Sequence, residues 1–143
     1  MTDAISSFGT LLKIGGGGTA EQFTTIAEVR DISGPPLGLG TEEVTSQSSP
    51  GGWREFVPTL LEAGEVTFDL NFVPTDPTHS YSAGLIDDMV SRTLRNFELV
   101  FPDTGATTWA FAAYVTGVEP DEPVEGALAA SVTLTISGQP TLE

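Results

Sequence analysis

The stretch GEVTFDLNFVP, residues 64–74, alternates apolar and polar side chains without a break. Its apolar side chains are those of Val66, Phe68, Leu70 and Phe72, and its polar side chains are those of Glu65, Thr67, Asp69 and Asn71. A side-chain period of two is typical of a strand that is buried on one face only. The sequence therefore predicts a strand with one face in a core. Its polar face is directed at solvent, or at something that passes through solvent.

Five further stretches are predicted as strands, at residues 8–14, 23–32, 95–101, 107–119 and 126–138. The alternation breaks twice within residues 23–32, which predicts a bulge or bend there. The last stretch directs Leu128, Ala130, Val132, Leu134 and Ile136 inward and presents a small, hydroxyl-rich face of Ala129, Ser131, Thr133, Thr135 and Ser137. We expect this face to resemble the polar face of residues 65–71.

Residues 37–62 are rich in glycine and serine and are predicted to form a long mobile loop. Short strands at residues 42–45 and 53–57 would pair there as a hairpin with a mobile tip. Trp53, Phe56 and Val57 are too apolar to stay in water. They either fold back on the core or wait for a neighbouring molecule.

A single helix is predicted after the turn at residues 76–80. Thr78 or Ser80 is the expected N-cap, and Gly84 is expected to weaken the helix by up to ~1 kcal/mol relative to alanine. The apolar helical face is predicted to carry Tyr81, Leu85, Ile86, Met89 and Val90, and the solvated face Asp87, Asp88 and Arg92. The whole chain, residues 1–143 with a flexible start at about 1–7, is thus expected to be one mostly-β domain. Its fold class is a β-sandwich or half-open barrel with one α-helix packed against it.

Composition narrows the function. Asp and Glu number 20 against five Lys and Arg, a formal charge of −15, which disfavours binding of nucleic acid through its phosphates. Disulfides and thiolate metal sites are excluded because the chain has no cysteine. Neither a secretory signal nor an apolar run of ~20 residues is present in the sequence. We therefore expect a protein that is made and used in solution, without a membrane.

No arrangement of residues indicates an enzyme. Asp87 and Asp88 diverge by ~100° on a helix, and Glu65 and Asp69 are separated by roughly 13 Å along a strand. Asp121, Glu122 and Glu125 would offer oxygen ligands to a hard cation, but without the EF-hand spacing. His79, the only histidine, is read as part of the turn before the helix. No catalytic residue, cofactor or metal is predicted.

Four segments, in order along the chain, resemble the tail tube proteins of long non-contractile (siphovirus, lambda-like) bacteriophage tails. They are residues 26–35 (IAEVRDISGP), 54–60 (REFVPTL), 64–72 (GEVTFDLNF) and 132–142 (VTLTISGQPTL). Each motif is soft, so the resemblance depends on the series, which spans nearly the whole chain. Some lambda-like relatives carry an additional immunoglobulin-like domain, which is not expected in this sequence.

The resemblance implies a structural protein of the virion tail, assembled in the host cytoplasm as hexameric rings that stack into a tube. Sheets of neighbouring subunits would join around the lumen, and the loop at residues 37–62 would become ordered on stacking. Its implied partners are other copies of itself, the tape measure protein, the tail tip or initiator and the tail terminator. Genomic DNA would pass through the lumen during ejection without specific binding.

Strand alternation, combined with this resemblance, predicts which residues face the lumen and which contact other subunits. The lumen-facing candidates are Glu65, Thr67, Asp69, Asn71, Ser131, Thr133 and Thr135. The inter-ring or inter-subunit contact candidates are Glu42, Glu43, Trp53, Arg54, Phe56 and Val57. Two alternatives stay open: another phage structural module, such as a tail terminator or decoration protein, and a cation- or carbohydrate-binding β-sandwich.

Overall fold

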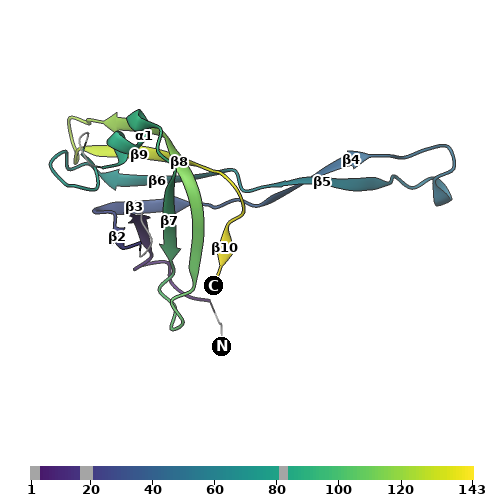
Figure 1. The fold of residues 1–143 in the computed structure, drawn as a ribbon, viewed down its shortest axis with the longest axis horizontal. Coiled ribbons are helices and arrows are strands. Elements are labelled where there is room, and N and C mark those ends of the chain that lie inside the picture. Colours follow the sequence, from purple (N-terminus) through teal and green to yellow (C-terminus); the bar gives the residue numbers. More distant parts are fainter. Residues whose placement is uncertain (1–3, 17–20, 81–83) are drawn as a thin grey trace.

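The computed structural model describes residues 4–16, 21–80 and 84–143. An eight-stranded antiparallel sheet has the order β2-β1-β7-β8-β9-β6-β3, with β10 also paired to β8, and a second sheet contains only β4 and β5 (Figure 1). The elements of the main sheet are β1 (Leu11–Gly15), β2 (Phe23–Thr25), β3 (Val29–Ser33), β6 (Glu65–Asn71), β7 (Arg95–Val100), β8 (Thr108–Asp121), β9 (Ala129–Ile136) and β10 (Thr141–Leu142). One helix, α1 (Leu85–Ser91), accompanies them. The predicted fold class, mostly β with one helix, is confirmed.

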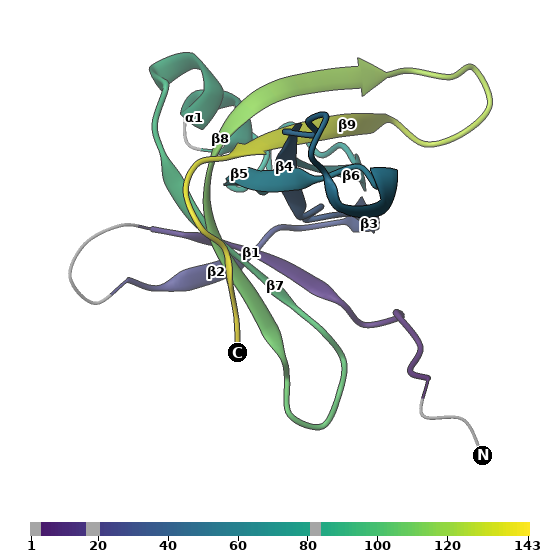
Figure 2. The ribbon, with the colours of Figure 1, turned by 90° about the vertical axis from the view of Figure 1, so that its right-hand side faces the viewer.

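The long strand β8 divides the large sheet into two halves. Its first part pairs with β7 up to Ala113, and the part from Ala113 to Asp121 pairs with β9. Figure 2 shows the strands of the two halves running in different directions, so that one continuous sheet folds over its own core. This explains how a single sheet provides the two packed layers that a sandwich requires.

The core confirms the alternation of the stretch that defines β6. Val66, Phe68 and Leu70 are all at most 2% exposed. From the other half of the sheet, Leu12, Phe97 and Leu99 complete the core against them. Phe97 and Phe111 stack across β7 and β8 with ring centroids 5.7 Å apart. Full burial of such side chains stabilises the fold by about 1.5–3 kcal/mol each.

The stretch at residues 23–32, predicted as one strand with a bend, is two strands in different halves of the sheet. β2 pairs with β1, whereas β3 pairs with β6. Between them Ile26 is buried and donates its N–H to the Leu12 carbonyl, and Glu28 has a φ of 59°. The first break in alternation is therefore a crossing from one half to the other. The second, between Val29 and Ile32, is an irregularity of register as predicted.

The helix begins later than predicted. Gly84 precedes α1 in an extended conformation, so neither Thr78 nor Ser80 is its N-cap. Thr78 instead takes part in a turn in which its hydroxyl and its N–H both donate to Asp76 Oδ1, at 2.5 and 2.8 Å. The hydroxyl contact first, and the N–H contact second, hold the pKa of Asp76 below its usual value. Tyr81, predicted on the apolar helical face, lies outside the described residues. No helix in the described ranges is long and apolar enough to cross a membrane.

Helix propensity alone predicts that alanine at position 84 would stabilise the protein. The structure predicts the opposite. A Cβ at this position would lie 2.5 Å from the Ser80 nitrogen and 2.6 Å from the Thr78 carbonyl carbon, both backbone atoms. Because backbone cannot rotate away, we expect Gly84→Ala to lower the free energy of unfolding by about 1–3 kcal/mol. Urea denaturation of the two proteins measures this. A variant that is more stable than the parent would contradict the packing seen here.

Asp88, predicted on the solvated face of the helix, is buried at 2% exposure. Arg95 donates to Asp88 Oδ1 from Nε at 3.0 Å and from a terminal nitrogen at 2.9 Å. The other terminal nitrogen of Arg95 donates to the Gly15 carbonyl at 2.7 Å. Asp88 Oδ2 has no hydrogen-bond partner in the described structure. The prediction was wrong because the helix turns this carboxylate toward β7.

The burial of Asp88 gives the fold a definite pH dependence. Burial raises the pKa of Asp88, and Arg95 only partly opposes the shift. A folded-state pKa above the unfolded value of about 3.9 means that the contribution of Asp88 to stability is full below that value. It is lost as the pH rises through the folded pKa. We expect the parent protein to lose stability relative to Asp88→Asn as the pH rises from about 3.9 toward neutrality, as measured by urea denaturation. A difference that is constant across this range would contradict the raised pKa.

Candidate interaction surfaces

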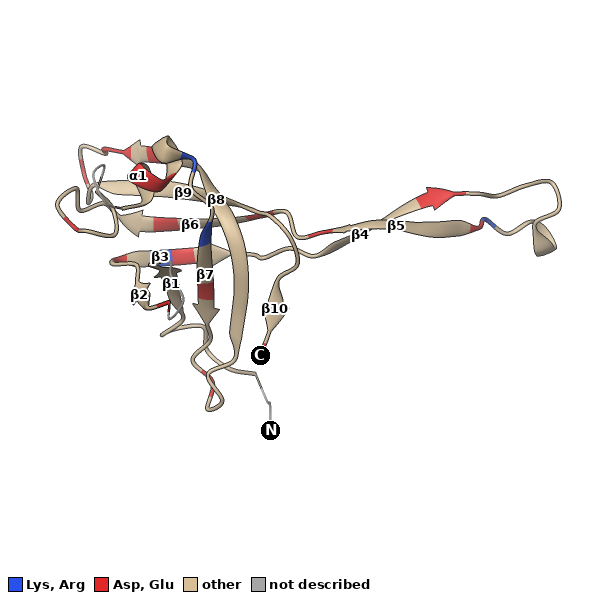
Figure 3. Cartoon of the chain, viewed as in Figure 1, with Lys and Arg blue, Asp and Glu red and all other residues tan. Residues whose placement is uncertain are grey.

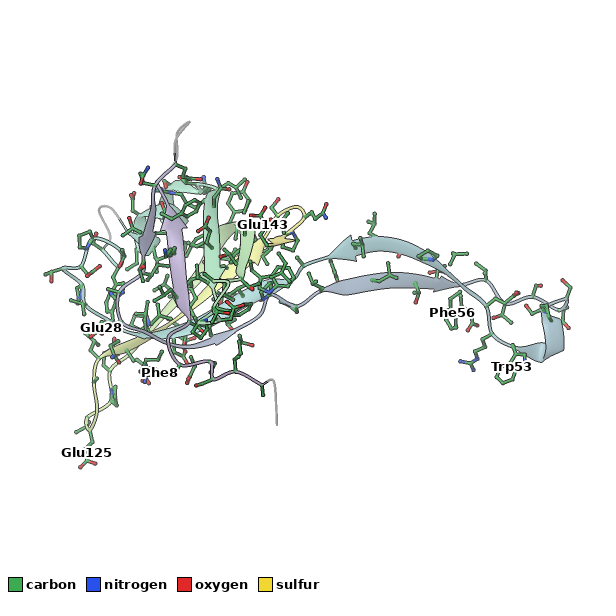
Figure 4. The ribbon with its side chains drawn as sticks, turned by 90° about the horizontal axis from the view of Figure 1, so that it is seen from below. Phe8, Glu28, Trp53, Phe56, Glu125 and Glu143 are labelled. Atoms are coloured by element: carbon green, nitrogen blue, oxygen red, sulfur yellow. The ribbon has the colours of Figure 1, made fainter. Side chains whose placement is uncertain are left out.

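Residues 38–62 form a β-hairpin that extends away from the body of the protein, hereafter the arm (Figure 1). Its strands are β4 (Gly38–Glu43) and β5 (Phe56–Glu62), and the 3₁₀ turn η1 (Pro50–Gly52) lies near its tip. The predicted hairpin is confirmed, but its strands lie nearer the body than predicted: residues 44–45 and 53–55, predicted as strand, lie outside both strands. Figure 4 places Trp53 and Phe56 at the end far from the body.

The arm exposes apolar side chains on both of its faces. Every residue of β5 is exposed, with Leu60 at 83% and Leu61 at 80%, and Trp53, before the strand, is 78% exposed. An isolated two-stranded hairpin is marginally stable in water. Exposed apolar groups concentrated on one element indicate a surface that is covered by a partner. The sequence left two alternatives open for Trp53, Phe56 and Val57. All three are exposed, so the alternative in which they fold back on the core is wrong.

Polar contacts give the tip a defined shape. Ser49 Oγ donates to Glu55 Oε2 at 2.6 Å and accepts from the Ser46 N–H at 2.9 Å. The Glu55 N–H donates to Thr45 Oγ1 at 2.8 Å. These contacts hold the turn that carries Trp53, so the indole is presented on an ordered segment.

All six predicted contact residues lie on the arm. Glu43 is opposite Phe56 and Glu42 is opposite Val57 in the register of β4 and β5. Arg54 Nε is 3.9 Å from Glu43 Oε2, and both side chains are largely exposed. An exposed pair at this distance contributes little to stability. The arginine is thus available to another carboxylate.

The predicted polar face is assembled from β6 and β9. Its members meet as cross-strand pairs, Glu65 with Thr135, Thr67 with Thr133, and Asp69 with Ser131, while Asn71 pairs with Ala129. Ser131 Oγ donates to Asp69 Oδ1 at 2.7 Å. All seven predicted residues therefore share one face of the sheet, opposite the core residues of the same strands.

The structure adds residues of β8 that sequence reasoning missed. Glu119 pairs with Ser131, Asp121 with Ala129, and Tyr114 with Thr135, which places them on the same polar face. Glu119 was predicted as the last residue of the strand at 107–119, and Asp121 lay between the predicted strands. The register shifts between Val115 and Gly117, and this bulge moves the outward positions from even to odd residue numbers. Glu119 and Asp121 are acidic residues two positions apart, and this alternation in the sequence could have indicated that the polar face continues along β8.

His79 is held in the fold by hydrogen bonds to the main chain. His79 is buried, accepts from the Val73 N–H through Nδ1 at 3.1 Å and donates from Nε2 to the Ala27 carbonyl at 2.7 Å. Both ring nitrogens therefore have structural partners. Among the residues that the structure describes, no three His, Asp or Glu side chains are grouped to hold a metal ion.

Two strand edges beside the polar face have no partner within the described chain. β3 ends the strand order next to β6. β7 pairs with β8 only up to Ala113, so one edge of β8 from Tyr114 to Asp121 carries no strand. Free edges are a liability in an isolated subunit and a means of joining subunits.

Unpartnered edges and an exposed apolar arm define a structural subunit that is completed by other molecules. Comparison of the sequence with known families gives the particular class: residues 16–143 match the family described as "Lambda phage tail tube protein, TTP". The chain belongs to this family. It is a phage tail tube protein, a non-enzymatic structural component of the virion tail, and the resemblance noted in the sequence is confirmed.

Solved structures share the fold. A chain in the virion of the native gene transfer agent particle has 21% identity and a TM-score of 0.74, with 98% of this chain and 99% of that chain covered. A chain of the tail of the empty gene transfer agent particle, which has C6 symmetry, has 22% identity and a TM-score of 0.73, with the same coverage of both chains. The SPP1 tail tube has 15% identity and a TM-score of 0.67, with 93% of this chain and 75% of that chain covered. No curated protein matches at a significant level.

Proposed function

We propose that this tail tube protein assembles as hexameric rings that stack into a tube, and that genomic DNA passes through the lumen during ejection. The observation that supports this best is the combination of two free strand edges beside the polar face with an apolar arm that projects beyond the body. The edges point to lateral joining and the arm to axial joining. The tail of the empty gene transfer agent particle, which shares the fold, has C6 symmetry.

Within a ring, the free edge of β3 in one subunit pairs with the free edge of β8 in the next. Each subunit then contributes the strand set β8, β9, β6 and β3 to a closed barrel. Closure removes the edges. The arm is left to contact the adjacent ring, where its leucines and aromatic side chains become buried.

The polar face of the four strands lines the lumen in this arrangement. Its carboxylates and hydroxyls, from Glu65, Asp69, Glu119 and Asp121 and from the threonines and Ser131, repel DNA phosphates rather than bind them. Six subunits of charge −15 give a ring of about −90, whose field is screened beyond about 8 Å at physiological salt. The tape measure protein occupies the lumen before ejection, and the tail tip and terminator complexes start and end polymerisation.

The lateral contact can be tested by disulfide cross-linking because the chain contains no cysteine. Ser33→Cys in β3 is combined in turn with Thr116→Cys and Glu119→Cys in β8, all exposed positions. Oxidation of assembled protein is expected to give a ladder that ends at six subunits on a denaturing gel. The control pairs Thr116→Cys with Thr24→Cys in β2, an edge of the other half. A ladder from the control pair but not from the test pairs would overturn the edge assignment.

A further inference from the structure

A groove of about 640 Å³ lies at the base of the arm, where the arm joins the body. Its apolar lining includes Leu37, just before the arm, and Leu61 within the arm. It also includes Ile136 at the end of β9 and Pro140 between β9 and β10. Glu62, at the end of β5, and Glu65, at the start of β6, also line it. Leu37 is 61% exposed and Leu61 is 80% exposed, so the groove is open to another molecule. Its volume is within the range of about 300–1,000 Å³ that is usual for small-ligand sites.

We infer that this groove receives the tip of the arm, Trp53 and Arg54, from a second copy of the chain. The inference rests on the proposed function, because it specifies how one ring contacts the next. The indole of Trp53 packs against the apolar wall, and the guanidinium of Arg54 pairs with Glu62 at the rim. One aromatic anchor with one charged group beside it is typical of residues that dominate an interface.

Charge complementarity supports this occupant. Arg54 is the only Lys or Arg between Arg30 and Arg92, and Figure 3 shows it as the single basic segment on the arm. Its side chain is 78% exposed, and its contact with Glu43, at 3.9 Å, is beyond hydrogen-bond distance. The groove, in turn, presents the carboxylates of Glu62 and Glu65 with no cation among the residues that line it.

The occupant must come from another copy. Figures 1 and 4 show the tip and the base at opposite ends of the same arm, so the tip does not reach its own groove. A contact between two different surfaces of identical subunits is heterologous, and it leaves a free tip and a free groove at each end of the assembly. Such a contact propagates, which is the property that a stacking interface requires.

The inference is tested by exchanging the charges in trans. Arg54→Glu and Glu62→Arg, each purified alone, are expected to raise the concentration needed for tube formation at least about tenfold. An equimolar mixture of the two is expected to restore tubes, because the Arg54→Glu tip then meets the Glu62→Arg groove and the unaltered tip meets the unaltered groove. Electron microscopy and sedimentation of the same samples measure this.

In the matched control, Arg54→Glu is mixed with Glu43→Arg instead of Glu62→Arg. Glu43→Arg reverses the charge of the residue beside Arg54 on the same arm. Restoration by Glu43→Arg but not by Glu62→Arg would overturn the inference, as would tubes that form normally in both single variants. If the unaltered protein forms no tubes even with tail-tip complexes present, the proposed function fails. If the unaltered protein forms tubes and the single variants Arg54→Glu and Glu62→Arg form them at the same concentration, only the groove assignment fails.

Discussion

Leu60→Ser combined with Leu61→Ser is expected to abolish tube formation at concentrations where the unaltered protein assembles. The two leucines are 83% and 80% exposed in the free subunit, so the fold gains little from them. Burial against an adjacent ring would stabilise the contact by at least about 1.5 kcal/mol for each leucine. The loss of about 3 kcal/mol per subunit corresponds to a roughly hundredfold higher critical concentration. Sedimentation across a concentration series measures this shift.

Two controls separate assembly from folding. Val124→Ser removes a fully exposed apolar side chain from the β8–β9 loop, away from the arm, and is expected to change neither assembly nor stability. The arm variant is expected to unfold at the same urea concentration as the unaltered subunit. Tubes that form at an unchanged concentration would show that the arm does not supply the axial contact.

Thr67→Lys combined with Asp69→Lys is expected to slow or stall DNA ejection while assembly stays intact. Both residues lie on β6 in the interior of the four-strand set, away from the free edges and from the groove at the base of the arm. Lysines that face the lumen would bind phosphates and release counterions. We expect the ejection rate to fall at least about tenfold at low salt and to recover as salt is raised, because screening weakens the attraction.

The comparison variants isolate the sign of the charge. Asp69→Asn removes one negative charge without adding a cation and is expected to have a small effect. Thr24→Lys on β2 with Thr104→Lys in the turn between β7 and β8 adds two cations away from the polar face and is expected to leave ejection unchanged. Ejection at the normal rate from well-formed tails carrying Thr67→Lys and Asp69→Lys would mean that this face does not line the lumen.

The parts of the fold that could be predicted are those marked by a regular spacing of apolar and polar side chains within a short stretch of sequence. The alternation in β6 and β9 gave their buried and polar faces, because a strand fixes side-chain direction residue by residue. The hairpin followed from glycine- and serine-rich punctuation between apolar segments. What sequence reasoning could not provide were the length of β8 and the bulge at Val115–Gly117. A bulge is determined by the pairing of β8 with β9, which lies outside any local window.

The errors around the helix have a tertiary cause. Asp88 has the polarity of a solvated residue, and only the approach of Arg95 from β7 makes its burial possible. The start of the helix is set by the close approach of Gly84 to the backbone of residues 78–80, which overrides the capping preference of Thr78 and Ser80. In the same way, the partition of residues 23–32 between two halves of the sheet reflects the path of the chain rather than its local propensity.

The most direct test of self-assembly is analytical ultracentrifugation of the purified protein across a concentration series, with negative-stain electron microscopy of the same samples. We predict long polymers of stacked six-fold rings, formed either spontaneously or after addition of tail-tip complexes. Discrete single rings that never stack would indicate a terminator-like subunit instead. A subunit that stays monomeric even with tail-tip complexes present would contradict the account.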